Sequence, residues 1–177
     1  MIEAREFAKA LFLISEEEGS SDAMLEDVML ADAVFTENPT YVKLLDTPAI
    51  EKSEKLSLID GSFGAVNENL KNLIKILCQR HSVYAYSRVA AAYSELYDTS
   101  RDIERVVAVT AIKMTDKQLS ALAEKLEKIT SKRVIIKNET DTAILGGIKL
   151  RYSGVQLDGS VKTRLDSFEK KLKSLVI

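Results

Sequence analysis

The spacing of apolar residues changes near residue 102, and this change limits the folds that are open to the chain. Before that point, apolar residues recur every three or four positions, which is the spacing of helices with one buried face. After it, β-branched residues gather in short runs that begin with Val106, Val107 and Val109. The sequence therefore predicts an α+β protein, with an all-α domain at residues 1–104 and a small α/β domain at residues 105–177.

The first domain is predicted to be a bundle of six helices. Asn38-Pro39 and Thr47-Pro48 both fall between apolar stripes, where a residue without an N–H group is tolerated. Ser20-Ser21-Asp22 is suited to cap the second helix. Short connections of this kind are typical of compact helical bundles. Four of the expected helices cover residues about 2–18, 50–60, 66–80 and 83–101. The second is expected through Met24, Leu25, Val28, Ala31 and Phe35, and a short third one through Tyr41, Leu44 and Leu45.

The second domain is predicted to combine strands with helices. Thr115 begins a helix and Gln118 stands three residues later, which is the capping-box arrangement. Ser153-Gly154 separates two strands, which are expected to form a hairpin. A last helix is expected from about Val161 to Leu175. The order is strand, helix, strand, strand, strand, helix, with strands near residues 106–111, 134–136, 148–152 and 155–157.

Composition describes an ordinary globular chain whose charge is unevenly distributed. Of the 177 residues, 46% are apolar, yet no apolar run approaches the roughly 20 residues that cross a membrane. Early acidic residues, Glu3 and Glu6, argue against a secretory leader and favour the cytoplasm. Residues 1–104 carry 10 Lys and Arg against 19 Asp and Glu, and residues 105–177 carry 15 against 8. The split suggests that the two domains face different partners, although two solvated surfaces can also differ this much by chance.

The residues that usually carry catalysis or bind metals are scarce. The only histidine, His81, lies at the end of the fifth helix, where a cation suits the helix dipole. The only cysteine, Cys78, lies on an apolar helix and is expected to be a small core residue. No phosphate-binding glycine motif is present. Asp158 stands next to a glycine, and a turn or a helix cap explains it without chemistry. The sequence predicts no active site, no cofactor and no metal.

Two helices of the first domain have wider apolar arcs than a single packing contact requires. Such an arc occurs in a helix at the centre of a bundle, where it touches several neighbours. It also occurs where two helices form a groove that accepts a partner's amphipathic helix. On the second interpretation, the contact residues are Ala4, Phe7, Ala8, Leu11, Phe12 and Ile14 of the first helix and Leu70, Leu73, Ile74 and Leu77 of the fifth.

The last predicted helix carries an apolar seam of the heptad type. Val161, Leu165, Phe168, Leu172 and Leu175 follow one another at spacings of four and three. Covering the small sheet is the expected use of this seam. The part beyond Phe168 is predicted to extend past the sheet, so Phe168, Leu172 and Leu175 are the candidates for contact with a partner helix.

Three groups of residues resemble one known family. Arg5 to Phe12 is similar to its opening helix, and Asn38-Pro39, Pro48 and Lys55 stand where it has Asn-Pro, a second Pro and a Lys. The most specific pattern is structural and closes the chain: Leu145-Gly146-Gly147-Ile148, Gly154, Asp158-Gly159-Ser160-Val161 and Leu165. In this order the groups resemble the delta subunit of the bacterial F-type ATP synthase, the family of the oligomycin-sensitivity conferral protein.

The resemblance implies a structural subunit of the peripheral stalk, or stator, with no active site of its own. In that family the helical domain binds N-terminal helices of the alpha subunits on the catalytic head. The C-terminal domain binds the C-terminal ends of the membrane-anchored b subunits. This link resists the torque of the rotor, so that proton flow is coupled to ATP synthesis. The resemblance also implies a peripheral protein at the cytoplasmic face of the bacterial cell membrane, with no transmembrane segment and no nucleic acid partner.

Two alternatives from other functional classes remain open from the residues alone. Lys170, Lys171 and Lys173 add to a basic C-terminal half, which would suit a regulatory or nucleic-acid-binding module, although no aromatic platform accompanies them. A small enzyme acting through Asp158 would need a pocket and a shifted pKa.

Overall fold

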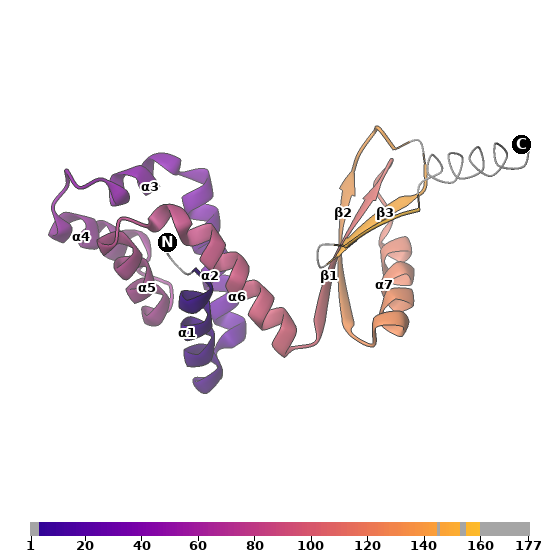
Figure 1. Ribbon diagram of the computed structural model, residues 1–177, viewed down its shortest axis with the longest axis horizontal. Coiled ribbons are helices and arrows are strands. Elements are labelled where there is room, and N and C mark those ends of the chain that lie inside the picture. The colour runs from indigo at the N-terminus through magenta and orange to yellow at the C-terminus, as the bar shows by residue number, and fades with distance from the viewer. Residues whose placement is uncertain (1–3, 145, 153–154, 160–177) are drawn as a thin grey trace, which may run out of the picture. The chain divides into compact units, whose positions relative to one another are not determined.

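The chain folds into two compact units, and the computed structural model describes residues 4–144, 146–152 and 155–159. The units divide between Tyr97 and Asp98, so the last turn of helix α6 (Tyr86–Ser100) belongs with the second unit. The boundary predicted from the sequence stands later, between residues 104 and 105. The first unit is helical and the second combines strands with a helix (Figure 1), which confirms the prediction of a mixed α and β fold.

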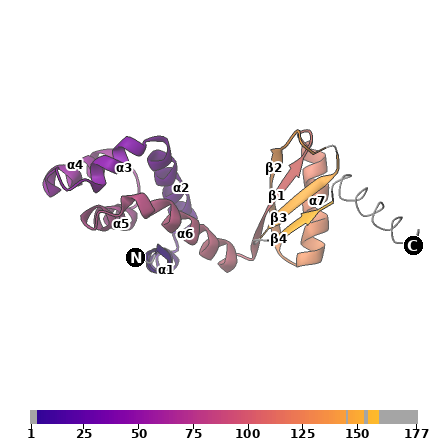
Figure 2. The ribbon, with the colours of Figure 1, turned by 45° about the horizontal axis from the view of Figure 1, so that its top comes forward.

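Five α-helices precede α6 in the first unit (Figures 1 and 2). A proline stands where α2 gives way to α3, and another lies between α3 and α4. Pro39 takes the first position of α3, where its missing N–H group has no helical acceptor to lose. Asn67 caps α5, because its side chain accepts a hydrogen bond from the backbone N–H of Asn69 at 2.8 Å. The five helices are α1 Ala4–Glu17, α2 Ser21–Glu37, α3 Pro39–Asp46, α4 Lys52–Ser62 and α5 Glu68–Gln79.

Ser20 does not cap α2 in the way that the sequence predicts. It stands at the capping position, but its side chain makes no hydrogen bond to the first N–H groups of the helix. Gly19, with a φ of +64°, turns the chain so tightly that Ser20 is not in the extended conformation that capping residues usually adopt. The next hydroxyl, that of Ser21, donates instead to the carboxylate of Glu16 on α1.

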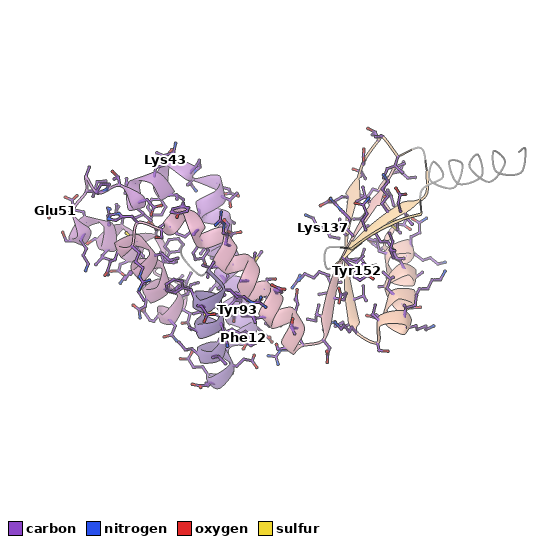
Figure 3. All side chains as sticks on the ribbon, viewed as in Figure 1. Phe12, Lys43, Glu51, Tyr93, Lys137 and Tyr152 are labelled. Carbon is purple, nitrogen blue, oxygen red and sulfur yellow. The ribbon has the colours of Figure 1, made fainter. Side chains whose placement is uncertain are left out.

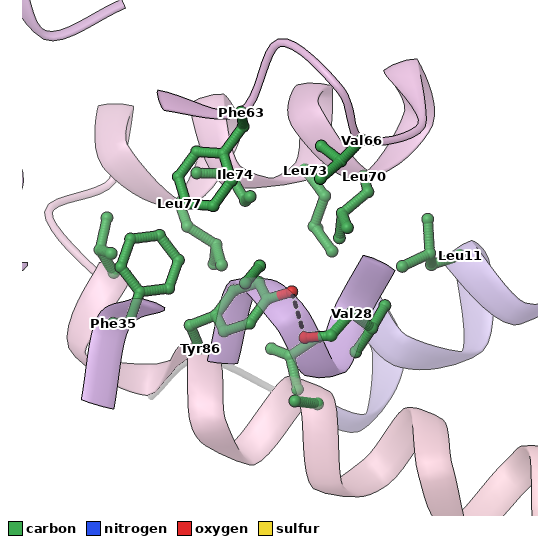
Figure 4. Close-up of a cluster of buried hydrophobic side chains, with 14 of the residues drawn as sticks. Leu11, Val28, Phe35, Phe63, Val66, Leu70, Leu73, Ile74, Leu77 and Tyr86 are labelled. Carbon is green, nitrogen blue, oxygen red and sulfur yellow. Dashed lines mark hydrogen bonds between the residues drawn. The ribbon is translucent and has the colours of Figure 1, made fainter. Parts of the chain in front are cut away.

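The core of the first unit takes side chains from all six α-helices. Phe12 of α1 packs edge-on against Tyr93 of α6, with ring centres 5.8 Å apart (Figure 3). Phe35 of α2 packs in the same manner against Tyr86 of α6, at 5.0 Å. The Tyr86 hydroxyl donates to the carbonyl of Val28 at 3.2 Å, which satisfies a polar group inside the core (Figure 4). These contacts join helices distant in the sequence into one packed body.

The second unit is built on a four-stranded sheet with the order β2-β1-β3-β4. The parallel pair β1 and β2 requires a crossover, which helix α7 (Asp116–Thr130) supplies. β3 and β4 form the predicted antiparallel hairpin, with Tyr152 opposite Val155. The strands are β1 Ile103–Thr110, β2 Arg133–Thr140, β3 Ile148–Tyr152 and β4 Val155–Asp158.

Helix α7 begins with the predicted capping box and covers one face of the sheet. The Thr115 hydroxyl accepts from the backbone N–H of Gln118 at 3.4 Å, and the Gln118 side chain accepts from the backbone N–H of Thr115 at 2.9 Å. Figure 2 shows α7 lying against the sheet. Val106, Ala108 and Val134 are buried, and the register of β1 and β2 puts them on the same face. The predicted last helix, from about residue 161, lies outside the described residues.

Candidate partner-binding surfaces

Helices α1 and α5 run antiparallel and meet along a line that we call the α1–α5 seam. At one end the guanidinium of Arg80, just beyond α5, lies 5.6 Å from the ring centre of Phe7. At the other end the Asn69 side-chain amide donates to the carboxylate of Glu18, just beyond α1, at 2.9 Å. Residues spaced seven and four apart share a helix face. The seam is therefore defined by Phe7, Ile14 and Glu18 on one side and Asn69, Ile76 and Arg80 on the other.

Most of the candidate contact residues on these two helices are buried inside the first unit. α5 contacts α1, α2 and α4, so its wide apolar arc meets several neighbours of the same chain. Figure 4 shows Leu11 of α1 and Leu70 of α5 within one cluster of side chains. In the described structure these side chains pack against other helices of the same chain. The buried residues are Ala8, Leu11, Leu70, Leu73, Ile74 and Leu77.

The remaining candidates of α1 stay accessible at its edges. Ala4, Phe7 and Phe12 are half-buried against the core, and Ile14 is 39% exposed. On α5 the accessible apolar residue is Ile76, which is 42% exposed and is not among the predicted contact residues. The sequence could have indicated Ile76, because it is an apolar residue that is adjacent to Leu77 but lies outside the buried stripe of the helix. The seam thus has a buried apolar floor and two exposed isoleucines at its rim.

The single histidine and the single cysteine have structural surroundings. His81 is exposed, and its ring Nδ1 lies 2.8 Å from the backbone carbonyl of Asp46, in the last turn of α3. The Lys55 ammonium donates to the nearby carbonyl of Thr47, so His81 and Lys55 both contact carbonyl groups at the C-terminal end of one helix. Cys78 is buried as predicted, and burial raises the pKa of its thiol. Within the described residues no cluster of His, Cys, Asp or Glu could hold a metal ion.

The glycine pattern of the second unit shapes one end of the β3–β4 hairpin. Gly147 has a φ of +86°, a conformation that other residues rarely adopt. The Gly159 N–H donates to the carbonyl of Ile148 at 3.0 Å, and a Cβ at Gly159 would lie only 3.2 Å from that oxygen. Asp158 pairs with Lys149 across the hairpin, with Oδ2 and Nζ 3.4 Å apart. Gly154 and Ser160, and the candidate residues Phe168, Leu172 and Leu175, lie outside the described residues.

A pocket of about 710 Å³ opens beside this glycine pattern, between the start of α7 and the start of β3. Its walls are mostly apolar, and Ile112 at its edge is 80% exposed. The lining residues are Thr110, Ala111, Ile112, Lys113, Met114, Gln118, Ala121, Leu122, Lys125, Gly146, Gly147 and Ile148.

The family assignment rests on a match along almost the whole chain. The family described as ATP synthase delta (OSCP) subunit matches residues 4–172. The chain belongs to the ATP synthase delta (OSCP) family. ATP synthase subunit delta of Clostridioides difficile (strain 630) is 34% identical over 175 residues, which cover 98% of this chain and 97% of that relative. The subunit of the same name from Geobacillus sp. (strain WCH70) is 30% identical, with 96% of each chain covered.

The same family fold is found in a solved assembly. A chain of the Toxoplasma gondii mitochondrial ATP synthase hexamer superposes with a TM-score of 0.75 over 97% of this chain and 98% of that one, at 19% identity. As a delta (OSCP) family member, the chain is a component of the peripheral stalk of an F-type ATP synthase and not a catalytic subunit. The resemblance seen in the sequence is confirmed, and the nucleic-acid alternative finds no support. Among the described residues, no helix is both long enough and apolar enough to cross a membrane.

Proposed function

We propose that the two units of this delta (OSCP) family member bind two different partners of the ATP synthase. The six-helix bundle, within residues 1–104, binds N-terminal helices of the alpha subunits on the catalytic head. The α/β domain, within residues 105–177, binds the C-terminal ends of the b subunits. The chain then holds the head against the torque of the rotor at the cytoplasmic face of the bacterial membrane, so that proton flow stays coupled to ATP synthesis.

The α1–α5 seam is our proposed site for the alpha-subunit helix, and its rim carries this proposal. Ile14 and Ile76 are large aliphatic residues that stay exposed beside the buried Leu11 and Leu73. A helix laid along the seam would cover both isoleucines and the accessible edge of Phe7. The buried candidates would then act indirectly, by fixing the spacing of the two helices. Arg80 and Glu18 at opposite ends would orient a helix that carries the complementary charges.

The b subunits are assigned to the second unit on the basis of charge and of the predicted last helix. This half has an excess of basic residues, the reverse of the first unit. Phe168, Leu172 and Leu175 continue a heptad-type seam near the end of the chain, and such a seam suits pairing with another helix. Two surfaces of opposite charge on one chain give each partner its own site.

The test of the head-binding proposal compares neighbouring residues of one helix. A peptide with the N-terminal residues of the alpha subunit from the same organism is titrated into the full-length chain by calorimetry. Wild type should bind near the micromolar range, about 8 kcal/mol. Ile14→Asp and Ile76→Asp should each weaken binding at least tenfold, about 1.4 kcal/mol. Leu13→Asp is the matched control, because Leu13 is 52% exposed on the same helix but off the seam.

Two results would count against this proposal. If the wild-type chain does not bind the peptide, the alpha subunit is not the partner of the first unit. If Leu13→Asp weakens binding as much as Ile14→Asp, the partner does not follow the seam. Circular dichroism of each variant, compared with wild type, separates lost binding from lost folding.

A further inference from the structure

A network of hydrogen bonds centred on Asn138 engages polar groups of Thr110, Ile112 and Met114, three residues that line the pocket beside α7. The Asn138 side-chain amide donates to the carbonyl of Ala108 at 2.8 Å and to the hydroxyl of Thr110 at 3.0 Å. The Thr110 hydroxyl donates to the carbonyl of Ile112 at 2.7 Å. The backbone N–H of Met114 donates to the side-chain oxygen of Asn138 at 2.7 Å. This network holds the loop between β1 and α7 in one shape, and it leaves the pocket walls to apolar side chains.

The apolar walls fit side chains of another polypeptide better than a small polar molecule. A small-molecule site needs several convergent polar groups to orient its ligand. Here the side chains of Thr110 and Asn138 are consumed by the loop. Small residues, Ala121 of α7 and Gly146, let an incoming chain approach the backbone closely. An apolar side chain as exposed as that of Ile112, at the rim of a pocket, is typical of a surface that another chain covers.

Two lysines at the rim give the pocket a positive charge. Lys113 and Lys125 line it, and no acidic residue does. Both side chains are exposed, and neither has an ion-pair partner within the described part of the chain. An occupant that places carboxylates near these ammonium groups would gain charge-assisted contacts and would associate faster.

The chain's own end fits this charge pattern poorly. Residue 159 lies beside the pocket, since the Gly159 N–H donates to Ile148 in its wall. Residues 160–177 follow next in the sequence, and they carry five Lys and Arg against two Asp and Glu. Their net charge has the same sign as Lys113 and Lys125. Charge complementarity therefore favours a partner over the end of this chain.

We propose that this pocket receives an amphipathic helix of a partner protein, with apolar side chains in the pocket and carboxylates against Lys113 and Lys125. The inference rests on the proposed function, in which the second unit binds a b subunit, and it names where and by which chemistry that subunit is recognised. The helix inserts apolar residues spaced three or four apart between Ile112 and Leu122. Acidic residues on its flanks face the two lysines.

The experiment measures the affinity of full-length chain for a b-subunit dimer from which the membrane-spanning residues have been removed. Lys113→Glu/Lys125→Glu should weaken binding at least tenfold at low salt, with a smaller loss at high salt because screening already weakens the wild-type contact. Ala121→Trp, which fills the pocket, should weaken it at all salt concentrations. Lys128→Glu is the control, because Lys128 is exposed on the same helix and does not line the pocket.

Each outcome separates this inference from the proposed function. If the dimer binds wild type but the pocket variants keep wild-type affinity, the pocket inference is overturned and the proposed function stands. If wild type does not bind the dimer while the alpha-subunit peptide still binds, the second unit has a different partner and both claims about it fail. If Ala121→Trp lowers the Tm without the dimer and leaves its affinity unchanged, the chain's own end fills the pocket, and the inference is overturned.

Discussion

The hydroxyl oxygens of Ser15 and Tyr93 lie 2.8 Å apart inside the first unit and join α1 to α6 across 78 positions of sequence. Both side chains are fully buried. The Ser15 hydroxyl also donates to the carbonyl of Phe12 at 2.8 Å, one turn back on its own helix. The Tyr93 hydroxyl therefore donates to Ser15, and the carbonyl oxygen of Ser21, at 3.4 Å, is a second and more distant acceptor for the same proton. One small polar cluster therefore ties the start of α2 to both helices.

Removing the Tyr93 hydroxyl should destabilise the first unit without unfolding it. Tyr93→Phe deletes the bond to Ser15 but keeps the ring that packs against Phe12. The expected loss is about 1 kcal/mol of unfolding free energy, which is typical for one buried hydrogen bond. Urea denaturation followed by circular dichroism measures it. Tyr84→Phe is the control and should be silent, since Tyr84 is exposed. An equal loss in both variants would mean that the buried bond contributes nothing.

The stability of the first unit should fall at high pH through its buried tyrosines. Burial raises the pKa of the Tyr86 phenol above its ordinary value of about 10, and nearby Asp32 and Asp27 raise it further. The unfolded chain then loses this proton at a lower pH than the folded chain. The contribution of Tyr86 is thus fully present below about pH 10 and is lost progressively as the pH rises above it.

The measurement is the urea midpoint between pH 8 and 11.5, for wild type and for Tyr86→Phe. The variant should lose about 1 kcal/mol at pH 8, because the bond to Val28 is gone. Its stability should then fall less steeply above pH 10 than that of wild type. Parallel slopes would show that Tyr86 ionises equally in both states. Comparing slopes removes the contribution of lysines, which titrate in the same range.

Adjacent residues of α5 should respond in opposite ways to the same change. Leu77 is fully buried, so Leu77→Asp places an unpaired charge in the core and should cost more than about 3 kcal/mol. Ile76→Asp should keep the helical signal, since Ile76 faces outward. Circular dichroism and thermal melts distinguish the two. A folded Leu77→Asp variant that has lost only head binding would mean that Leu77 reaches the partner.

Truncation after Phe168 should separate the two proposed binding activities. The shortened chain lacks Leu172 and Leu175, so we expect weaker binding to the b-subunit dimer. Binding of the alpha-subunit peptide should be unchanged, because the seam lies in the other unit. Pull-down of each partner with the same preparation checks this. Loss of both activities would mean that the truncation acts through global folding, and loss of neither would remove the last helix from the binding site.

Local chemistry made much of this fold predictable. Pro39 and Pro48 separate helices because a residue without an N–H group is poorly tolerated inside one. Thr115 and Gln118 form their capping box because the two side chains and the two N–H groups lie within a single turn. The β3–β4 hairpin follows from alternating strand residues around a tight turn. Each of these features depends on residues only a few positions apart.

Features that depend on distant neighbours were less accessible. Ser20 fails to cap α2 because the turn at Gly19 sets its backbone angles, and spacing alone does not reveal this. The apolar arc of α5 was compatible with a core helix or with a partner groove. It is largely filled by α1, α2 and α4, and a sequence without contacts cannot distinguish these two uses.

Within the described residues, the order of helices and strands and the change of period near residue 102 could be predicted from the sequence, because short-range sterics and hydrogen bonding determine them. Which apolar residues remain at the surface was settled by packing. Leu77 and Ile76 are equally hydrophobic neighbours, and only the position of α5 between other helices buries the first and exposes the second. Likewise, Lys113 and Lys125 line one pocket only because α7 folds back against the sheet, which brings together residues that no local rule connects.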